Sequence, residues 1–142
     1  MSTEFPSKPG IKREWHLLDA DNVVLGKLAS QAAMLLMGKH KTTYTPFLDT
    51  GDHVIVVNAA KVKLTGKKDD QKVYRRFTGY PGGLVEVGAR KMRATRPTRM
   101  IEDAIFGMLP KTKLGKQMYR KLKVYAGEKH PHVAQKPVSM TI

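Results

Sequence analysis

Apolar positions in the first sixty residues follow two different periods. Residues 16–20 form a short apolar run that ends in acidic and amide residues, which predicts a buried strand closed by a turn. Residues 25–37 instead place apolar side chains at helical spacing, and Gly38 follows as a helix-ending residue. Residues 53–59 are rich in β-branched side chains and predict a second buried strand. A strand, a helix and a strand in this order are typical of an α/β fold with a parallel sheet.

The pattern is less regular between these elements and residue 97. Residues 72–78 have strand propensity with polar interruptions, and residues 84–87 resume a short strand-like run. Between them, residues 79–83 contain three glycines and one proline, which predicts a turn or loop. We interpret this loop as structural and not as a nucleotide-binding loop.

A regular pattern returns at Pro97, which suits the first turn of a helix that Pro110 ends. The apolar stripe of this helix comprises Met100, Ile101, Ala104, Ile105, Met108 and Leu109. A second helical stretch over residues 114–122 has an apolar face with Leu114, Met118 and Leu122. Its remaining surface is basic and holds Lys113, Lys116, Gln117, Arg120 and Lys121. Residues 124–126 predict a last short strand, and the polar tail from Gly127 is expected to extend along a surface or a partner.

Length and composition exclude several classes of protein. The chain has 142 residues, so we expect one domain over residues 1–142, with an N-terminal extension (1–12) and an extended tail (128–142). Cysteine is absent, which excludes a disulfide framework, a thiolate metal site and a cysteine nucleophile. No run approaches the ~18 apolar residues of a membrane span. The first ten residues lack the apolar stretch of a secretory signal, so we expect an intracellular protein.

The net charge points to a polyanionic partner. The chain carries a formal charge of +14 and has a pI of about 10.1. Residues 1–60 hold equal numbers of basic and acidic side chains, so the whole excess lies in residues 61–142. Most of it falls in three clusters, at 61–76, 90–99 and 111–123. Any one cluster could be a solvated face, but solubility needs far less net charge than the three together supply.

Motifs for catalysis and metal binding are missing from the sequence. A phosphate-binding loop would need glycines where Ala33 and Lys61 stand. A calcium-binding loop starting at Asp19 lacks its required glycine, and we interpret Asp19 and Asp21 as turn and cap residues. The sequence His-Pro-His at 130–132 is a weak metal pair that better suits a surface or an RNA-stacking role. We therefore expect no enzyme activity, no cofactor and no metal, and keep a nucleotide-using α/β enzyme with a basic surface as the alternative.

Nucleic acid explains the charge better than a membrane surface does. A membrane-bound helix needs exposed bulky residues opposite its basic face, whereas the apolar face of residues 114–122 is needed for the core. Tyr74, Phe77 and Tyr80 interleave with Arg75 and Arg76. These aromatic rings are either stacking platforms beside cations or core residues. Several separate basic segments without a compact reading motif favour a large folded RNA over a DNA operator.

Short motifs in a fixed order resemble those of the bacterial large-subunit ribosomal protein thirteen family. The signature lies in residues 107–110 (GMLP), 114–116 (LGK) and 121–127 (KLKVYAG). Further matches are Trp15 with 18–20, then 25–29, 38–41, 44–46, 49–52, 57–59, 65–66, 79–83 and 130–132. They cover nearly the whole chain beyond the first dozen residues. The chain departs from the family pattern at Phe106 and at residues 90–95, which lack the acidic residues common there.

The resemblance implies a three-layer α/β/α fold with a small, mostly parallel four-stranded sheet, basic loops and an extended C-terminal tail. It also implies a non-enzymatic constituent of the large ribosomal subunit, located in the cytoplasm within the ribosome. Such a protein binds 23S-type rRNA early in assembly, has neighbouring large-subunit proteins as partners, and has no membrane or small-molecule partner. Carried over by matching positions, the RNA contacts are Lys39, Lys41, Lys67, Lys68, Lys111, Lys113, Lys116, Arg120, Lys121 and Lys123.

Two further interpretations have no support from the matching motifs. Arg75 and Arg76 join the predicted RNA contacts on their charge and their aromatic neighbours alone. An RNA-binding regulator that acts outside the ribosome is a third function, which the sequence neither supports nor denies.

Overall fold

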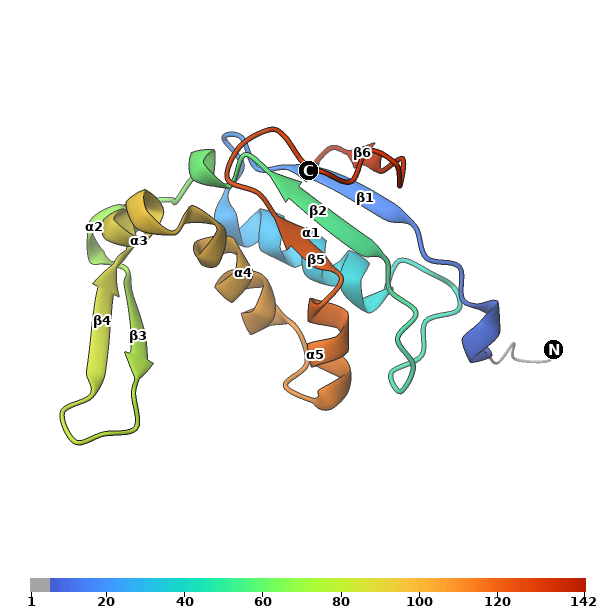
Figure 1. Ribbon diagram of the computed structural model, residues 1–142, viewed down its shortest axis with the longest axis horizontal. Coiled ribbons are helices and arrows are strands. Elements are labelled where there is room, and N and C mark those ends of the chain that lie inside the picture. The colour runs from blue at the N-terminus through green and yellow to red at the C-terminus, as the bar shows by residue number, and fades with distance from the viewer. Residues whose placement is uncertain (1–5) are drawn as a thin grey trace.

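The structure is a computed structural model that describes residues 6–142 (Figure 1). Residues 1–5 of the expected N-terminal extension lie outside the described residues. The helices are α1 (Leu25–Met37), α2 (Lys68–Gln71), α3 (Ala89–Thr95), α4 (Pro97–Met108) and α5 (Lys113–Tyr119), with short 3-10 turns at Lys8–Gly10 and Ala59–Lys61. The strands are β1 (Trp15–Asp19), β2 (His53–Val57), β3 (Val73–Phe77), β4 (Leu84–Gly88), β5 (Leu122–Val124) and β6 (Val138–Met140). Among the described helices, none has both the length and the apolar character needed to cross a bilayer.

The centre of the molecule is a four-stranded parallel sheet with the strand order β5-β2-β1-β6. Strands β1 and β2 pair along their whole length, and the chain passes between them through α1, as the βαβ pattern predicts. Leu18, Val54 and Val56 are buried on the side of the sheet that the helices cover. The α/β class and the mostly parallel four-stranded sheet are confirmed.

Helix α1 has the bounds that the sequence predicts, because helical spacing of apolar residues is followed by a definite end. Gly38 adopts the left-handed conformation, and its N–H donates to the carbonyls of Met34 and Leu35 at 3.1 Å. The whole predicted stripe is buried: Leu25, Leu28, Ala29, Ala32, Leu35 and Leu36.

Helix α4 packs beside α1 on the same side of the sheet. Met100, Ile101 and Ile105 are buried in the common core, as predicted. Met108 was expected on the same stripe, but 44% of its surface is exposed. Leu109, the next residue of the stripe, is buried as predicted, so Met108 alone of these two residues points away from the core.

The expected helix over residues 114–122 is shorter than predicted. The N–H groups of Arg120 and Lys121 bond to carbonyls of α5, and the helix ends at Tyr119. Leu122 then pairs with Val54 as the first residue of β5, so the strand begins earlier than the predicted 124–126. Leu122 still faces the core, which explains why its spacing from Met118 imitates a helical stripe.

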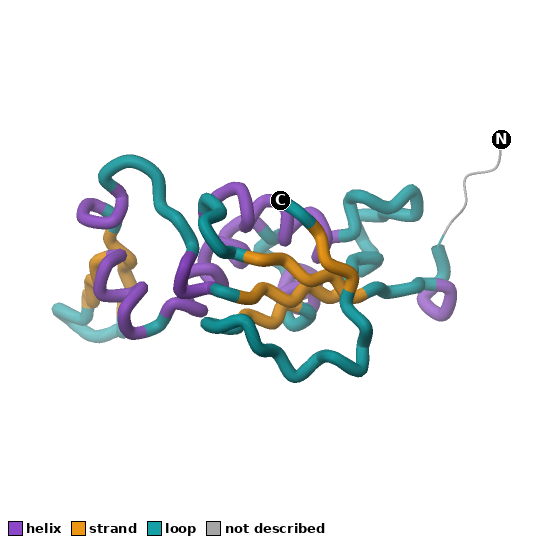
Figure 2. Tube along the Cα trace, turned by 90° about the horizontal axis from the view of Figure 1, so that it is seen from above, coloured by secondary structure: helices purple, strands orange, loops and turns teal. Residues whose placement is uncertain are grey.

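The opposite face of the sheet is covered by the C-terminal segment (Figure 2). Ile55 is buried but lies outside the main core cluster, on this second side. The His132 ring lies 5.2 Å from the Trp15 ring, and its Nε2 is 2.8 Å from the Tyr125 hydroxyl oxygen. The tail then runs beside β1 as β6, a strand that its polar, proline-containing sequence did not predict. The layer on this side of the sheet is therefore built by the tail.

Strands β3 and β4 form a separate antiparallel hairpin that projects from one end of the molecule (Figure 1). Gly79 and Gly82 have φ angles of 92° and 71°, a conformation that favours glycine. The N–H of Gly83 donates to the carbonyl of Tyr80 at 2.9 Å. The glycine-rich segment is therefore a hairpin turn, as the sequence predicts.

The turn at residues 49–52 packs tightly against the C-terminal end of α1. The N–H of Asp52 donates to the carbonyl of Leu35 at 3.0 Å. A Cβ atom on Gly51 would lie only 1.8 Å from the carbonyl oxygen of Leu36. Only glycine at position 51 allows the backbone of the turn to approach the helix this closely.

We expect Gly51→Ala to lower the free energy of unfolding by ~1–3 kcal/mol or more, because the added methyl group must displace backbone. Gly26→Ala is the matched control, since a Cβ on Gly26 in α1 meets nothing within 4 Å. The control should be at least as stable as the parent chain, because alanine favours a helix more than glycine does, and urea denaturation measures both variants. Equal midpoints for the two variants would show that the turn can move away from α1.

Candidate nucleic-acid interface

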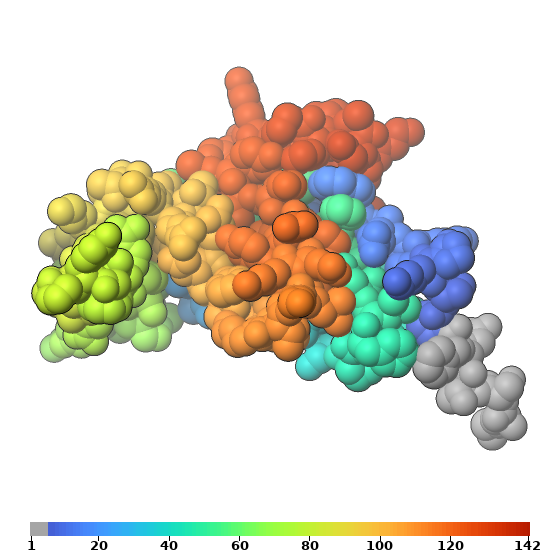
Figure 3. All heavy atoms as spheres, turned by 60° about the horizontal axis from the view of Figure 1, so that its bottom comes forward, coloured from blue at the N-terminus to red at the C-terminus, as the bar shows by residue number. Residues whose placement is uncertain are grey.

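Ten of the twelve predicted RNA-contacting side chains belong to exposed residues. They are Lys39, Lys67, Lys68, Arg75, Arg76, Lys111, Lys113, Lys116, Arg120 and Lys123. Figure 3 shows the hairpin, α5 and the loop that follows α1 on one face of the molecule. The exposed cations thus belong to several separate elements of the same folded body.

Helix α5 presents the densest group of these cations. The hydroxyl of Thr112 accepts from the N–H of Gly115 at 3.2 Å and caps the helix. Buried Gly115 and Met118 fix the inner side of the helix against the core. Lys113, Lys116 and Arg120 consequently lie on its exposed side. The helix therefore holds three cations at fixed spacing, as the amphipathic pattern predicts.

The loop before α5 adds one more cation. Lys111 Nζ donates to the carbonyl of Phe106 at 2.6 Å and lies 4.8 Å from the centre of the Phe106 ring. A lysine at the end of a helix is favoured there by the partial negative charge of the last carbonyls. Lys111 is thereby held next to the cations of α5.

The hairpin carries Arg75 and Arg76 on opposite faces. Arg75 Nε bonds to Glu86 at 2.6 Å across the two strands, so part of its charge is compensated. Arg76 lies on the other face, opposite Val85. Phe77 and Tyr80 are exposed by 66% and 76%, whereas Tyr74 is half-buried against the core cluster. Of the two interpretations left open, an exposed platform fits Phe77 and Tyr80. Tyr74 packs against the core and also lines a groove beside the hairpin, so core packing accounts for only part of its surface.

The remaining predicted residues lie apart from α5 and the hairpin tip. Lys67 and Lys68 lie at the start of α2, and Lys39 directly follows the end of α1. Lys123 lies in β5 between two core-facing residues, so its side chain faces the side of the sheet that the tail covers. The structure brings some predicted residues together but leaves these at separate places on the surface.

Lys121 was expected on the exposed basic face, and this expectation is wrong. Its Nζ bonds to Asp49 at 2.5 Å and to the carbonyl of Leu36 at 3.1 Å, and the residue is buried. Burial lowers the pKa of Lys121, and the contact with Asp49 opposes that shift. The helical wheel failed here because α5 ends before residue 121, which turns its side chain inward.

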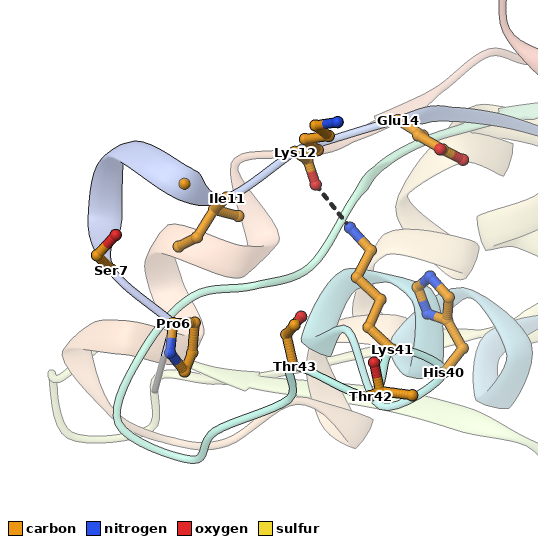
Figure 4. A pocket seen from close by; sticks show the side chains of 10 residues that line it. Pro6, Ser7, Ile11, Lys12, Glu14, His40, Lys41, Thr42 and Thr43 are labelled. Atoms are coloured by element: carbon orange, nitrogen blue, oxygen red, sulfur yellow. Dashed lines mark hydrogen bonds between the residues drawn. The ribbon is translucent and has the colours of Figure 1, made fainter. Parts of the chain in front are cut away.

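Lys41 is also occupied within the protein (Figure 4). Its Nζ donates to the carbonyl of Lys12 at 2.9 Å, to the carbonyl of Thr50 at 3.2 Å, and to Asp52 at 2.5 Å. It borders a surface pocket of about 650 Å³ that the N-terminal segment lines together with the loop after α1. The Lys41 ammonium is therefore paired within the protein, and its contact with RNA stays a prediction.

Asp52 is the buried acceptor of this cluster. Its two carboxylate oxygens also accept from the N–H of Glu14 at 2.9 Å and lie 3.2 Å and 2.9 Å from the Nε2 atoms of His16 and His40. Burial opposes its ionisation, but the bonds from Lys41, Glu14 and His16 outweigh burial and lower the pKa of Asp52 from 3.8. Asp52 is therefore a structural anion that the sequence reasoning did not assign.

The ligand atoms of His16, His40 and Asp52 lie within 4.8 Å of one another, a spacing that could suit a metal ion. The only carboxylate among them already pairs with the Lys41 ammonium. A divalent cation would therefore enter a buried site without net negative charge, which desolvation makes costly. We interpret the cluster as an ion-pair network that joins β1, the loop after α1 and the 49–52 turn.

A group of basic residues that the sequence did not predict as RNA contacts lies beside the hairpin. Lys91, Arg96 and Arg99 line a groove together with Arg76. The charge count had marked residues 90–99 as a basic cluster, but only the fold shows that this cluster faces β3 and β4.

Comparison with known protein families identifies the family of this chain. The family model described as ribosomal protein L13 matches residues 13–131. The chain belongs to the ribosomal protein L13 family. The resemblance seen in the short sequence motifs is confirmed, and with it a place for the chain among the structural constituents of the ribosome.

Individual relatives of the L13 family match over the full length. The chain is 72% identical over 142 residues to the large ribosomal subunit protein uL13 of Solibacter usitatus, covering 100% of this chain and 99% of that protein. It is 56% identical to the protein of the same name from Desulfitobacterium hafniense, with the same coverage. Against the uL13 protein of Dictyoglomus thermophilum it is 56% identical, with 100% of both chains covered.

We expect Lys121→Ala to destabilise the protein by ~3–5 kcal/mol, because it leaves Asp49 without its buried cation. Lys123→Ala, two positions along β5, changes an exposed lysine and should leave the denaturation midpoint unchanged. Thermal or urea unfolding compares the two variants. A Lys121→Ala protein as stable as Lys123→Ala would contradict the structural role of Lys121.

Acid should lower the free energy of unfolding below about pH 4. A carboxylate whose pKa is lowered by folding adds stability above its unfolded value of 3.8, and this stability is lost as the pH falls through the lower folded value. Asp52→Asn should flatten this decline, whereas Asp70→Asn, at an exposed ion pair with Arg90, should keep it. Unfolding free energies between pH 7 and pH 3 measure the effect; identical profiles for the Asp52→Asn variant and the parent chain would refute it.

Proposed function

We propose that the chain is a non-enzymatic component of the large ribosomal subunit that binds 23S-type rRNA through exposed cations and supports early subunit assembly. The observation that carries this proposal is the set of ten exposed basic residues on a rigid parallel-sheet body, in a chain whose relatives are named large ribosomal subunit proteins. Neighbouring large-subunit proteins are its further partners, and the ribosome in the cytoplasm is its location. In this proposal residues 1–142 act as one domain, with residues 1–12 and 128–142 as extensions.

The binding mechanism is phosphate neutralisation combined with shape. Each Lys or Arg that contacts a phosphate releases a counterion from the RNA. The logarithm of the binding constant therefore falls linearly with the logarithm of the salt concentration. The cations of α5 are held by the Thr112 cap and by the packing of Gly115 and Met118, so little order must be gained on binding. The separate positions of the hairpin, α5 and the start of α2 suit a folded RNA that contacts the protein at several places.

Aromatic side chains at the hairpin tip extend this interface. Phe77 and Tyr80 expose rings on which unpaired bases can stack, a contact that tolerates any base. Phe77 pairs with Leu84 across the hairpin, and Leu84 is also exposed, so the tip presents an apolar end beyond the basic strands. The tip therefore complements the phosphate contacts with base contacts.

Lys116→Glu combined with Arg120→Glu should weaken binding to isolated large-subunit rRNA by at least ~10-fold at about 0.1 M salt. Both residues are exposed on α5, so the circular dichroism spectrum should stay that of the parent chain. A filter-binding titration at several salt concentrations measures the affinity and its salt dependence. Undiminished rRNA affinity in the folded double variant would contradict the proposal.

The matched control for this experiment reverses two charges elsewhere. Lys8→Glu combined with Lys27→Glu changes the net charge by the same amount at exposed positions far from α5 in sequence. It should retain most of the rRNA affinity. An equal loss in both double variants would mean that overall charge, and not the α5 surface, determines binding.

A further inference from the structure

A groove of about 770 Å³ lies between the hairpin and helices α3 and α4. One face of the hairpin forms one wall, because Tyr74 lies opposite Val87 and Arg76 lies opposite Val85. Met92 of α3 adds a further apolar side chain. The floor of the groove is consequently apolar and contains one aromatic ring.

The rim of the groove is strongly basic. Arg76, Lys91, Arg96 and Arg99 contribute their side chains to it. Within residues 6–142, Asp103 is the one acid that lines the groove, and it forms an ion pair with Arg99 at 3.0 Å. For the other three, no acidic group of the described residues lies within ion-pair distance, while the neighbouring Arg75, Arg90 and Arg93 are all paired with acids. The groove therefore concentrates three uncompensated positive charges, although the neighbouring arginines each have an acidic partner.

Tyr74 provides an unused polar group at the floor. Its hydroxyl oxygen is buried and has no hydrogen-bond partner in the structure. Burial raises the pKa of Tyr74, so the hydroxyl keeps its proton and can donate it to an acceptor. A buried hydroxyl without a partner is costly, and a ligand with a hydrogen-bond acceptor would remove that cost.

The combination selects a particular kind of ligand. An apolar floor with an aromatic ring takes a flat, partly apolar group, and a rim of uncompensated cations takes phosphates. A stacked base in an RNA duplex has neither face free to enter such a groove, whereas an unpaired nucleotide presents its base and its phosphate separately. The volume is sufficient for one or two nucleotides and not for a helix.

We propose that this groove binds an unpaired RNA segment, with a base against Tyr74, Val85 and Val87 and the flanking phosphates on Arg76, Lys91 and Arg96. This inference rests on the proposed rRNA-binding function and adds a second kind of contact to it. The cations of α5 neutralise phosphates without regard to pairing, whereas the groove requires a single strand. The hairpin then forms one side of a binding groove, in addition to carrying exposed residues at its tip.

The test uses the full chain, large-subunit rRNA, and the variant Lys91→Ala with Arg96→Ala. Neither residue belongs to the contacts predicted from the sequence, so this test is independent of the α5 variant. If each cation meets a phosphate, the slope of log affinity against log salt should fall by about 2, and affinity should drop ~10–100-fold at about 0.1 M salt. Lys27→Ala with Lys129→Ala is the charge-matched control and should change neither quantity comparably.

Ultraviolet crosslinking of the complex followed by mass spectrometry tests the base contact. We expect a nucleotide adduct on Tyr74, from a nucleotide that chemical probing of the free rRNA shows to be unpaired. Adducts confined to Tyr80 and other residues outside the groove, with an unchanged salt slope for the Lys91 and Arg96 variant, would overturn the groove while leaving rRNA binding intact. An adduct on Tyr74 from a paired nucleotide would overturn the single-strand assignment, and a parent chain that does not bind rRNA would overturn both proposals.

Discussion

The structure depends on the hydrogen bonds that the last carbonyl groups of helix α1 accept from other segments of the chain. The last carbonyls of a helix carry partial negative charge and lack partners within the helix. Here the Leu35 carbonyl accepts from the N–H of Asp52, and the Leu36 carbonyl accepts from the ammonium of Lys121. Asp49 holds that ammonium at 2.5 Å. Three segments distant in sequence, namely the helix end, the 49–52 turn and the start of β5, are joined at this one point.

The same arrangement determines which charges reach the surface. Lys41 and Lys121 belong to motifs that look basic in sequence, yet both are bound to buried or nearly buried carboxylates. The exposed charge is therefore carried by α5, by the hairpin and by the helices next to it. If these elements bind RNA as proposed, the folded body already holds them in place, which lowers the entropy that binding must cost.

Much of the fold could be predicted because local patterns and tertiary packing agree in the first half of the chain. Helix α1 and strands β1 and β2 follow directly from the periods of their apolar residues. The inward turn of Lys121 could not be predicted, since it depends on α5 ending at Tyr119 and on a carboxylate 72 residues earlier. The groove beside Tyr74 was equally hidden, because its cations and its apolar floor come from elements that only the fold brings together. Periodicity reports which face of an element is apolar, but not where the element stops or what faces it.

The pairing of β6 with β1 bears on when this protein can finish folding. Residues 138–140 form the outer strand beside residues 16–18, so β1 obtains this partner only after about 120 further residues have been synthesised. During synthesis the outer edge of β1 remains unpaired, and an open edge of a parallel sheet can pair with other chains. A chain that stops before residue 138 would lack β6 and leave β1 as the edge strand of the sheet. Residues 138–140 thus cover the outer edge of a strand that holds buried residues, and β6, whose residues are exposed, takes its place as the edge.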